Sequence, residues 1–181
     1  MKYFSIILAI LGLVYSIYRF RKDKQKAIDG LGKIDKGRPP KLRIVYSRNQ
    51  QTKDRKKIQS SQDAYAVFKK IWSKQIEVRE EMYVLFLNRK NNVLGYHILS
   101  IGGITGTVAD LRLLFAVALK SLATSIIIAH NHPSGQLSPS GEDIELTKKI
   151  KETGDIMNIT LLDHLIVTTD TYYSFSDEGD L

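Results

Sequence analysis

A short polar segment that follows a fully apolar strand constrains this chain more than any other feature. Residues 125–129, Ser-Ile-Ile-Ile-Ala, are apolar at both parities, which predicts a strand buried on both faces. His130 and His132 follow directly, and residues two apart on an extended backbone project to the same side. Pro133 then disfavours helical geometry at His132. The sequence therefore predicts a strand whose carboxyl end presents two imidazoles toward one point.

The segment after these histidines predicts a loop and then a helix that supplies an acidic side chain. Residues 134–139 are rich in turn-forming residues, and Ser140 precedes a helical pattern at 141–153. Ser140 and Asp143 also have the spacing of a capping box, apart from Asp in place of Glu. That capping role is compatible with a second one, because a loop that folds back can bring the Asp143 carboxylate against both imidazoles.

Two imidazoles and one carboxylate favour an open zinc site. Catalytic zinc typically takes three protein ligands and a water, whereas structural sites use four ligands and usually include thiolates. The chain has no cysteine, which excludes a structural cysteine site. An isolated His-x-His pair is more often a surface feature, so the prediction rests on the loop and helix as well. We predict that His130, His132 and Asp143 bind Zn²⁺ and leave one position for a water, which needs a general base nearby.

The spacing of these residues resembles the metal-binding signature of the JAMM metalloproteases, also called the JAB1/MPN family. The likeness is carried by His130-x-His132-Pro133, six intervening residues, and Ser140-x-x-Asp143. The longer segment around this motif is similar to the sequence of the RadC branch. Further similar segments lie at residues 84–88, 102–107, 162–164 and 172–175. The resemblance covers residues 60 to 178.

The resemblance implies a zinc hydrolase that cleaves peptide or isopeptide bonds. His130, His132 and Asp143 would be its metal ligands, as the residues themselves suggest. Ser140 would donate a hydrogen bond to the oxyanion, and an upstream glutamate would activate the water. The substrate would be a protein or peptide of unknown identity.

The family's spacing to the strand at residues 85–87 matches that glutamate to Glu80. Glu81 would project to the opposite face of an extended strand, so only one of the two can face the site. Both parities of this strand are largely apolar, so its periodicity leaves Glu81 open as the alternative. Asp163 and His164 leave a similar choice, since His164 could orient a metal ligand or serve only the sheet.

Charge divides the chain into unlike parts. Residues 1–59 hold 16 lysines and arginines against 4 acidic residues, a net charge of +12, whereas residues 60–181 hold 11 against 15, a net charge of −4. About 120 residues are near the usual size of one domain. We therefore expect a folded domain at 60–181, preceded by a basic and flexible linker at 20–59.

Residues 1–19 form an apolar segment that is a candidate membrane anchor. Residues 3–18 are almost wholly apolar, and basic residues follow them. A membrane span needs about 17–25 residues, so the segment is at the lower limit, and an amphipathic extension that does not span is the alternative. The excess of positive charge after the segment predicts that the domain lies in the cytoplasm, held to the inner face of the membrane.

Nucleic acid is the alternative partner, because RadC-like proteins are associated with DNA repair. The basic linker would suit nucleic acid or anionic lipid, but the domain that bears the histidines is acidic. RadC relatives usually carry a helix-hairpin-helix module, in place of which we expect the apolar and basic segment here. A domain without catalytic activity is a third interpretation, although such JAB1/MPN members usually lack the ligands present here.

The pattern of the domain predicts α/β architecture. Helices are expected at 60–73, 110–122 and 141–153, and strands at 82–88, 93–100, 125–129, 157–162, 164–169 and 172–175. Strands mixed with three helices predict three layers, with a mixed sheet flanked by helices. The MPN/JAMM fold that the resemblance implies, which is cytidine-deaminase-like, is of this kind.

Overall fold

The sheet at the centre of the molecule has five strands in the order β2-β1-β3-β4-β5. The computed structural model describes residues 55–102 and 109–181. The strands are β1 (Glu81–Leu87), β2 (Val93–Ile101), β3 (Ser125–Asn131), β4 (Thr160–Val167) and β5 (Tyr172–Ser174). β3 and β4 are parallel, and the other neighbouring strands are antiparallel. The predicted mixed sheet is thereby confirmed.

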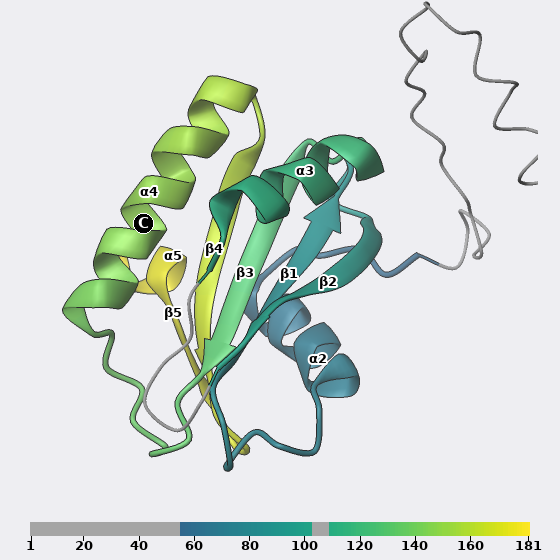
Figure 1. The fold of residues 1–181 in the computed structure, drawn as a ribbon. Coiled ribbons are helices and arrows are strands. Elements are labelled where there is room, and N and C mark those ends of the chain that lie inside the picture. The colour runs from purple at the N-terminus through teal and green to yellow at the C-terminus, as the bar shows by residue number, and fades with distance from the viewer. Residues whose placement is uncertain (1–54, 103–108) are drawn as a thin grey trace, which may run out of the picture. The chain divides into compact units, whose positions relative to one another are not determined.

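Helices cover both faces of this sheet. α2 (Ser61–Ile71) lies on one face, and α3 (Leu111–Ser121) and α4 (Gly141–Met157) lie on the other, as Figure 1 shows. A short helix, α5 (Phe175–Glu178), contacts β4. The arrangement confirms the predicted three layers of helix, sheet and helix.

Alternation along the central strands divides the core into two clusters. The side chains that face α3 and α4 have even numbers in β1 and β3: Met82, Val84, Phe86, Ile126 and Ile128. The side chains that face α2 have odd numbers: Tyr83, Leu85, Leu87, Ile127 and Ala129. All ten are buried, as expected for strands covered on both faces. The parity of a residue in β1 or β3 therefore decides which layer its side chain enters.

One strand replaces the two strands predicted at 157–162 and 164–169. β4 runs without interruption through Asp163 and His164, and a register shift in its pairing with β3 absorbs the irregularity. The Asp163 carboxylate accepts hydrogen bonds from Ser174 Oγ and from two backbone N–H groups. Because these donors satisfy the buried carboxylate, a charged residue does not break the strand.

Two helix boundaries also differ from the prediction. α4 continues four residues beyond 153 and ends where Asn158 takes a left-handed conformation with φ of 54°. The last predicted strand, 172–175, ends one residue early because Ser174 caps α5, and Gly179 closes that helix with φ of 83°. A single helical turn is too short to leave a periodic signal in the sequence.

The residues just before position 60 pack against the domain. Ile58 is buried, its N–H donates to the carbonyl oxygen of Asn91, and the N–H of Val93 donates to the carbonyl oxygen of Lys56. The folded domain therefore includes residues 55–59, the end of the segment predicted as linker. The candidate anchor at 3–18 lies outside the described residues. Within 55–102 and 109–181, no helix has the length and apolar character needed to cross a membrane.

Gly154 in α4 provides a test of how this helix packs. A Cβ atom at Gly154 would lie 2.3 Å from the backbone oxygen of Ile159, whereas one at Gly141 in the same helix would meet nothing within 4 Å. We expect Gly154→Ala to lower the free energy of unfolding by roughly 1–3 kcal/mol, because the backbone must shift. Helix propensity alone predicts a gain of about 1 kcal/mol. Urea unfolding of Gly154→Ala and of the control Gly141→Ala distinguishes these outcomes, and a stabilised Gly154→Ala would contradict the packing described.

Candidate metal centre

The three predicted metal ligands lie together at the carboxyl end of β3. Nε2 of His130 is 3.0 Å from Oδ1 of Asp143, and Nε2 of His132 is 3.5 Å from Oδ2. The two Nε2 atoms are 2.9 Å apart. Ligands of a tetrahedral zinc ion at about 2.0–2.1 Å lie roughly 3.3 Å from one another, close to these separations. The three side chains could therefore hold a metal ion.

Local structure aims each of these side chains. His130 lies within β3, where its even number turns it toward α4. Nδ1 of His132 lies 2.8 Å from the carbonyl oxygen of Gln136, so the loop after Pro133 folds back onto the ring. Asp143 is held by the capping box of α4, in which its Oδ2 accepts from the N–H of Ser140 at 2.8 Å. The carboxylate is thus oriented by the helix cap.

The site is closed on one side and open on the other. The side chain of His130 is fully buried, while 17% of His132 and 12% of Asp143 is exposed. Burial alone would raise the pKa of Asp143, but hydrogen bonds with His130 and His132 outweigh it and hold that pKa below its usual range. The hydrogen bond to Asp143 raises the pKa of His132 despite partial burial. In the absence of an ion, the bond to Asp143 therefore favours the protonated form of His132.

Glu80 lies on the same side of the sheet as the ligands. Met82 pairs with His130 in the antiparallel register of β1 and β3, and Glu80, two residues before Met82, has the same parity. Burial raises the pKa of Glu80, and the charges of His130 and His132 act in the opposite direction, as expected for a carboxyl group beside the imidazoles. Its carbonyl oxygen accepts from the N–H of Gly102.

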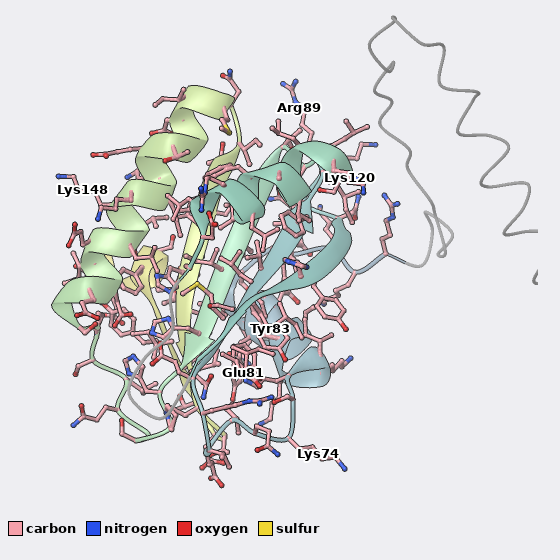
Figure 2. All side chains as sticks on the ribbon, viewed as in Figure 1. Lys74, Glu81, Tyr83, Arg89, Lys120 and Lys148 are labelled. Atoms are coloured by element: carbon pink, nitrogen blue, oxygen red, sulfur yellow. The ribbon has the colours of Figure 1, made fainter. Side chains whose placement is uncertain are left out.

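Glu81 lies on the other face of the sheet. One carboxylate oxygen accepts from Nε of Arg79 at 2.8 Å, and the other accepts from the hydroxyl of Tyr83 at 3.3 Å. Figure 2 shows Glu81 and Tyr83 together beside α2, on the side away from α4. Glu80 is therefore the one of the two glutamates that lies on the side of the predicted ligands, and its role as a general base stays a prediction.

Ser140 donates its hydroxyl hydrogen within the helix cap. Its Oγ lies 2.6 Å from Oδ2 of Asp143 and accepts from the Asp143 N–H at 3.1 Å. A hydroxyl has one hydrogen, so Ser140 cannot donate to Asp143 and to a substrate oxygen at once. The capping role expected from the sequence is present, and the oxyanion role stays a prediction.

Asn131 is a residue whose role the sequence did not suggest. Its Oδ1 accepts from the N–H of Glu81 at 2.7 Å, and its Nδ2 donates to the carbonyl oxygens of Ile76 and Arg79 at 2.6 and 2.9 Å. Asn131 thus holds the peptide groups on both sides of Glu80. Its place between two histidines, on the opposite face of the strand, was the only available signal.

His164 contacts one of the ligands. Its Nε2 lies 2.8 Å from Nδ1 of His130, and its Nδ1 lies 2.6 Å from Oγ1 of Thr147. Of the two interpretations open for His164, contact with a ligand is the one observed, whereas Asp163 faces Ser174 on the other side of β4. Thr147 was missed, although a residue four positions after Asp143 lies on the same helix face.

The three hydrogen bonds of Asn131 form a clamp on the segment around Glu80. A change of the Asn131 amide to a carboxylate tests this clamp. We expect Asn131→Asp to lower the free energy of unfolding by about 1–3 kcal/mol for each stranded carbonyl group, because the carboxylate cannot donate to Ile76 or Arg79. Asn88→Asp is the matched control, since Oδ1 of Asn88 only accepts, from the N–H groups of Lys90 and Asn92. Equal urea midpoints for the two variants would contradict the clamp.

Comparisons with known proteins agree with this geometry. The family model described as a RadC-like JAB domain matches residues 58–180. A UPF0758 protein of Flavobacterium johnsoniae is 50% identical over 124 residues, which cover 68% of this chain and 53% of that protein. A UPF0758 protein of Chlorobaculum parvum is 41% identical over 125 residues, which cover 68% of this chain and 55% of that protein.

The match is confined to one part of each relative. The chain spans about half the length of the curated relatives it matches. The matched part contains β1 to β5 and all of the residues gathered at the candidate metal centre. The chain belongs to the family of proteins with a RadC-like JAB domain.

Proposed function

We propose that this domain is a zinc-dependent hydrolase of the JAMM type that cleaves peptide or isopeptide bonds. The proposal is carried by one observation, the convergence of His130, His132 and Asp143 with Glu80 on the same side of the sheet. The JAB-domain family includes metalloproteases, which is compatible with this chemistry. Three protein ligands leave a coordination position for water, as in catalytic zinc sites.

The residues fit a divalent ion and a general base. When bound, zinc would act as a Lewis acid toward a carbonyl group and lower the pKa of water to about 7. Glu80 would accept a proton from the attacking water at its carboxylate and pass it to the leaving amine. The raised pKa of Glu80 suits this task, because a base works best when its pKa lies closer to the operating pH.

Ser140 would serve the oxyanion only after a change of partner. In the structure its hydroxyl hydrogen is given to Oδ2 of Asp143. Stabilisation of a substrate oxygen requires this hydrogen to turn outward while the N–H of Ser140 still holds the carboxylate. The cap thus has a second donor that keeps Asp143 in place when the hydroxyl turns.

The charge of the domain favours a peptide substrate over nucleic acid. Residues 60–181 have a net charge of −4, and Glu80 interacts electrostatically with Glu142 and Asp143 at the site. Phosphate-dominated binding requires a positive surface, which these carboxylates oppose.

The role of Glu80 is tested by a pair of substitutions. We expect Glu80→Gln to lower the rate of peptide or isopeptide hydrolysis by about 10²- to 10⁴-fold, because an amide cannot accept the proton of water. Bound zinc, measured by elemental analysis, should stay at one ion per chain. The control is Glu81→Gln, which faces α2 and should keep hydrolysis within a few-fold. Absence of zinc from the wild-type chain, or an active Glu80→Gln variant, would contradict the proposal.

Zinc binding should depend on pH with a defined sign. The pKa of His132 is raised in the metal-free protein, so its contribution to stability is complete below the ordinary value of 6.5 and is lost as pH rises through the raised value. Zinc needs the neutral imidazole, so its stabilisation grows as that proton leaves.

We therefore expect the zinc-induced rise in melting temperature to increase between about pH 6 and about pH 8. At a free zinc concentration 100 times Kd, the stabilisation reaches about 2.7 kcal/mol. Thermal unfolding with and without zinc measures it, and Asp143→Ala serves as a control that should show little response. A zinc effect that falls over this range would contradict the proton competition.

A further inference from the structure

A buried chain of hydrogen bonds runs from β3 through β4 to α4. Nδ1 of His130 lies 2.8 Å from Nε2 of His164, and Nδ1 of His164 lies 2.6 Å from Oγ1 of Thr147. Thr147 Oγ1 donates to the backbone carbonyl oxygen of Asp143 at 2.6 Å. His130 and His164 are fully buried, and Thr147 is 2% exposed. Because bulk water does not reach these groups, each must find its partner within the chain.

The last bond fixes the direction of the others. A carbonyl oxygen only accepts, so the Thr147 hydroxyl donates its single hydrogen to the carbonyl oxygen of Asp143. Oγ1 of Thr147 can then only accept from His164. Nδ1 of His164 must therefore carry a hydrogen. The ring of His164 is fully buried, and its two nitrogens face Thr147 and His130 rather than a carboxylate, so a second hydrogen would bury a charge without a counter-ion. The ring is therefore neutral with one N–H. Its Nε2 is then an acceptor, and the hydrogen between the two rings belongs to Nδ1 of His130.

When an ion is bound, this assignment leaves Nε2 of His130 with a lone pair for it. Without an ion, the same atom lies 3.0 Å from Oδ1 of Asp143, which only accepts, so a hydrogen on Nε2 takes the place of the ion. The tautomer of His132 is fixed by one hydrogen bond, because its Nδ1 donates to the carbonyl oxygen of Gln136. Both Nε2 atoms can thus offer lone pairs to one ion, which is the form of imidazole that binds metals.

We propose that His164 and Thr147 are positioning residues that hold His130 in the tautomer able to bind a metal. The inference rests on the proposed zinc site. The ring of His164 stacks on Phe175 with centroids 4.6 Å apart and planes 8° apart, which restrains its orientation. The chain of hydrogen bonds also links two predicted ligands from different elements. It begins at His130 on β3 and ends at the backbone carbonyl oxygen of Asp143 on α4.

Loss of the Thr147 hydroxyl would allow the hydrogen bond between His130 and His164 to reverse its direction. His164 could then carry its hydrogen on Nε2 and donate it to Nδ1 of His130. The hydrogen of His130 would move to Nε2, into the position that the ion needs. The structure therefore predicts that a residue without contact to the metal controls the affinity for it.

Thr147→Val in the full chain tests this inference, because valine has the shape of threonine without the hydroxyl. We expect the zinc affinity, measured by competition with a chelator, to fall about 10- to 100-fold. Thr147→Ser restores the hydroxyl and should remain within a few-fold of wild type. Thr153→Val is the matched control, because Oγ1 of Thr153 also donates to a carbonyl oxygen of α4, that of Lys149 at 2.7 Å, and this exposed bond involves no histidine.

A second readout does not depend on zinc. Long-range ¹⁵N–¹H NMR of the metal-free wild type at mildly alkaline pH should show hydrogen on Nδ1 of both His130 and His164. The Thr147→Val spectrum should show Nδ1 of His130 without hydrogen in part of the population. If the valine variant does not fold, the wild-type spectrum and the serine variant still decide.

The outcomes separate this inference from the proposed function. Unchanged zinc affinity in a folded Thr147→Val chain, or an Nδ1 of His130 without hydrogen in the wild type, overturns the positioning role while the zinc hydrolase stands. A wild-type chain that binds no zinc overturns the proposed function, and the tautomers seen by NMR then decide the inference alone.

Discussion

The antiparallel pairing of β1 with β3 places Glu80 at the end of the sheet where the two histidines lie. It sets Met82 opposite His130, and so brings the residue before β1 near the residue after β3. Both strands are buried on both faces, so a slip by one residue would move every side chain into the wrong layer. The energy that fixes the register comes from the two apolar clusters, and the polar residues at the strand ends take their positions from it. The site therefore inherits the precision of the core.

The topology of the sheet explains why a glutamate and two histidines from distant segments meet. In an all-parallel sheet only the carboxyl ends of strands gather at one edge, whereas an antiparallel neighbour brings its amino end to that edge. β3 and β4 are parallel, and β1 runs against them. The start of β1, with Glu80, thus lies beside the end of β3, with His130 and His132. Two adjacent strands can thus bring Glu80 and the two histidines together without a long loop, and α4 adds Asp143.

The sequence predicted the parts of the site that depend on local spacing. His130 and His132 are two residues apart on a strand, and the first turn of a capped helix carries Asp143, so periodicity and capping rules were sufficient. Glu80 and Glu81 could not be separated by pattern, because both faces of β1 are apolar. The choice depends on tertiary partners of Glu81. β4 was divided in the prediction for a related reason, since the donors that satisfy Asp163 come from residues 11 and 13 positions later.

Three successive residues at the end of β3 perform different tasks because an extended strand alternates its faces. His130 points to α4 and is held by His164, while Asn131 points the other way and holds the segment that carries Glu80. His132 lies beyond the strand and is held by the loop carbonyl of Gln136. Each of the three contacts ends on a different segment. The positions of the two histidines and of Glu80 therefore all depend on residues 130–132. A change in the backbone at the end of β3 would alter the geometry of the predicted metal ligands and the position of Glu80 together. Substitutions of single side chains, such as Thr147→Val and Asn131→Asp, can separate the two effects.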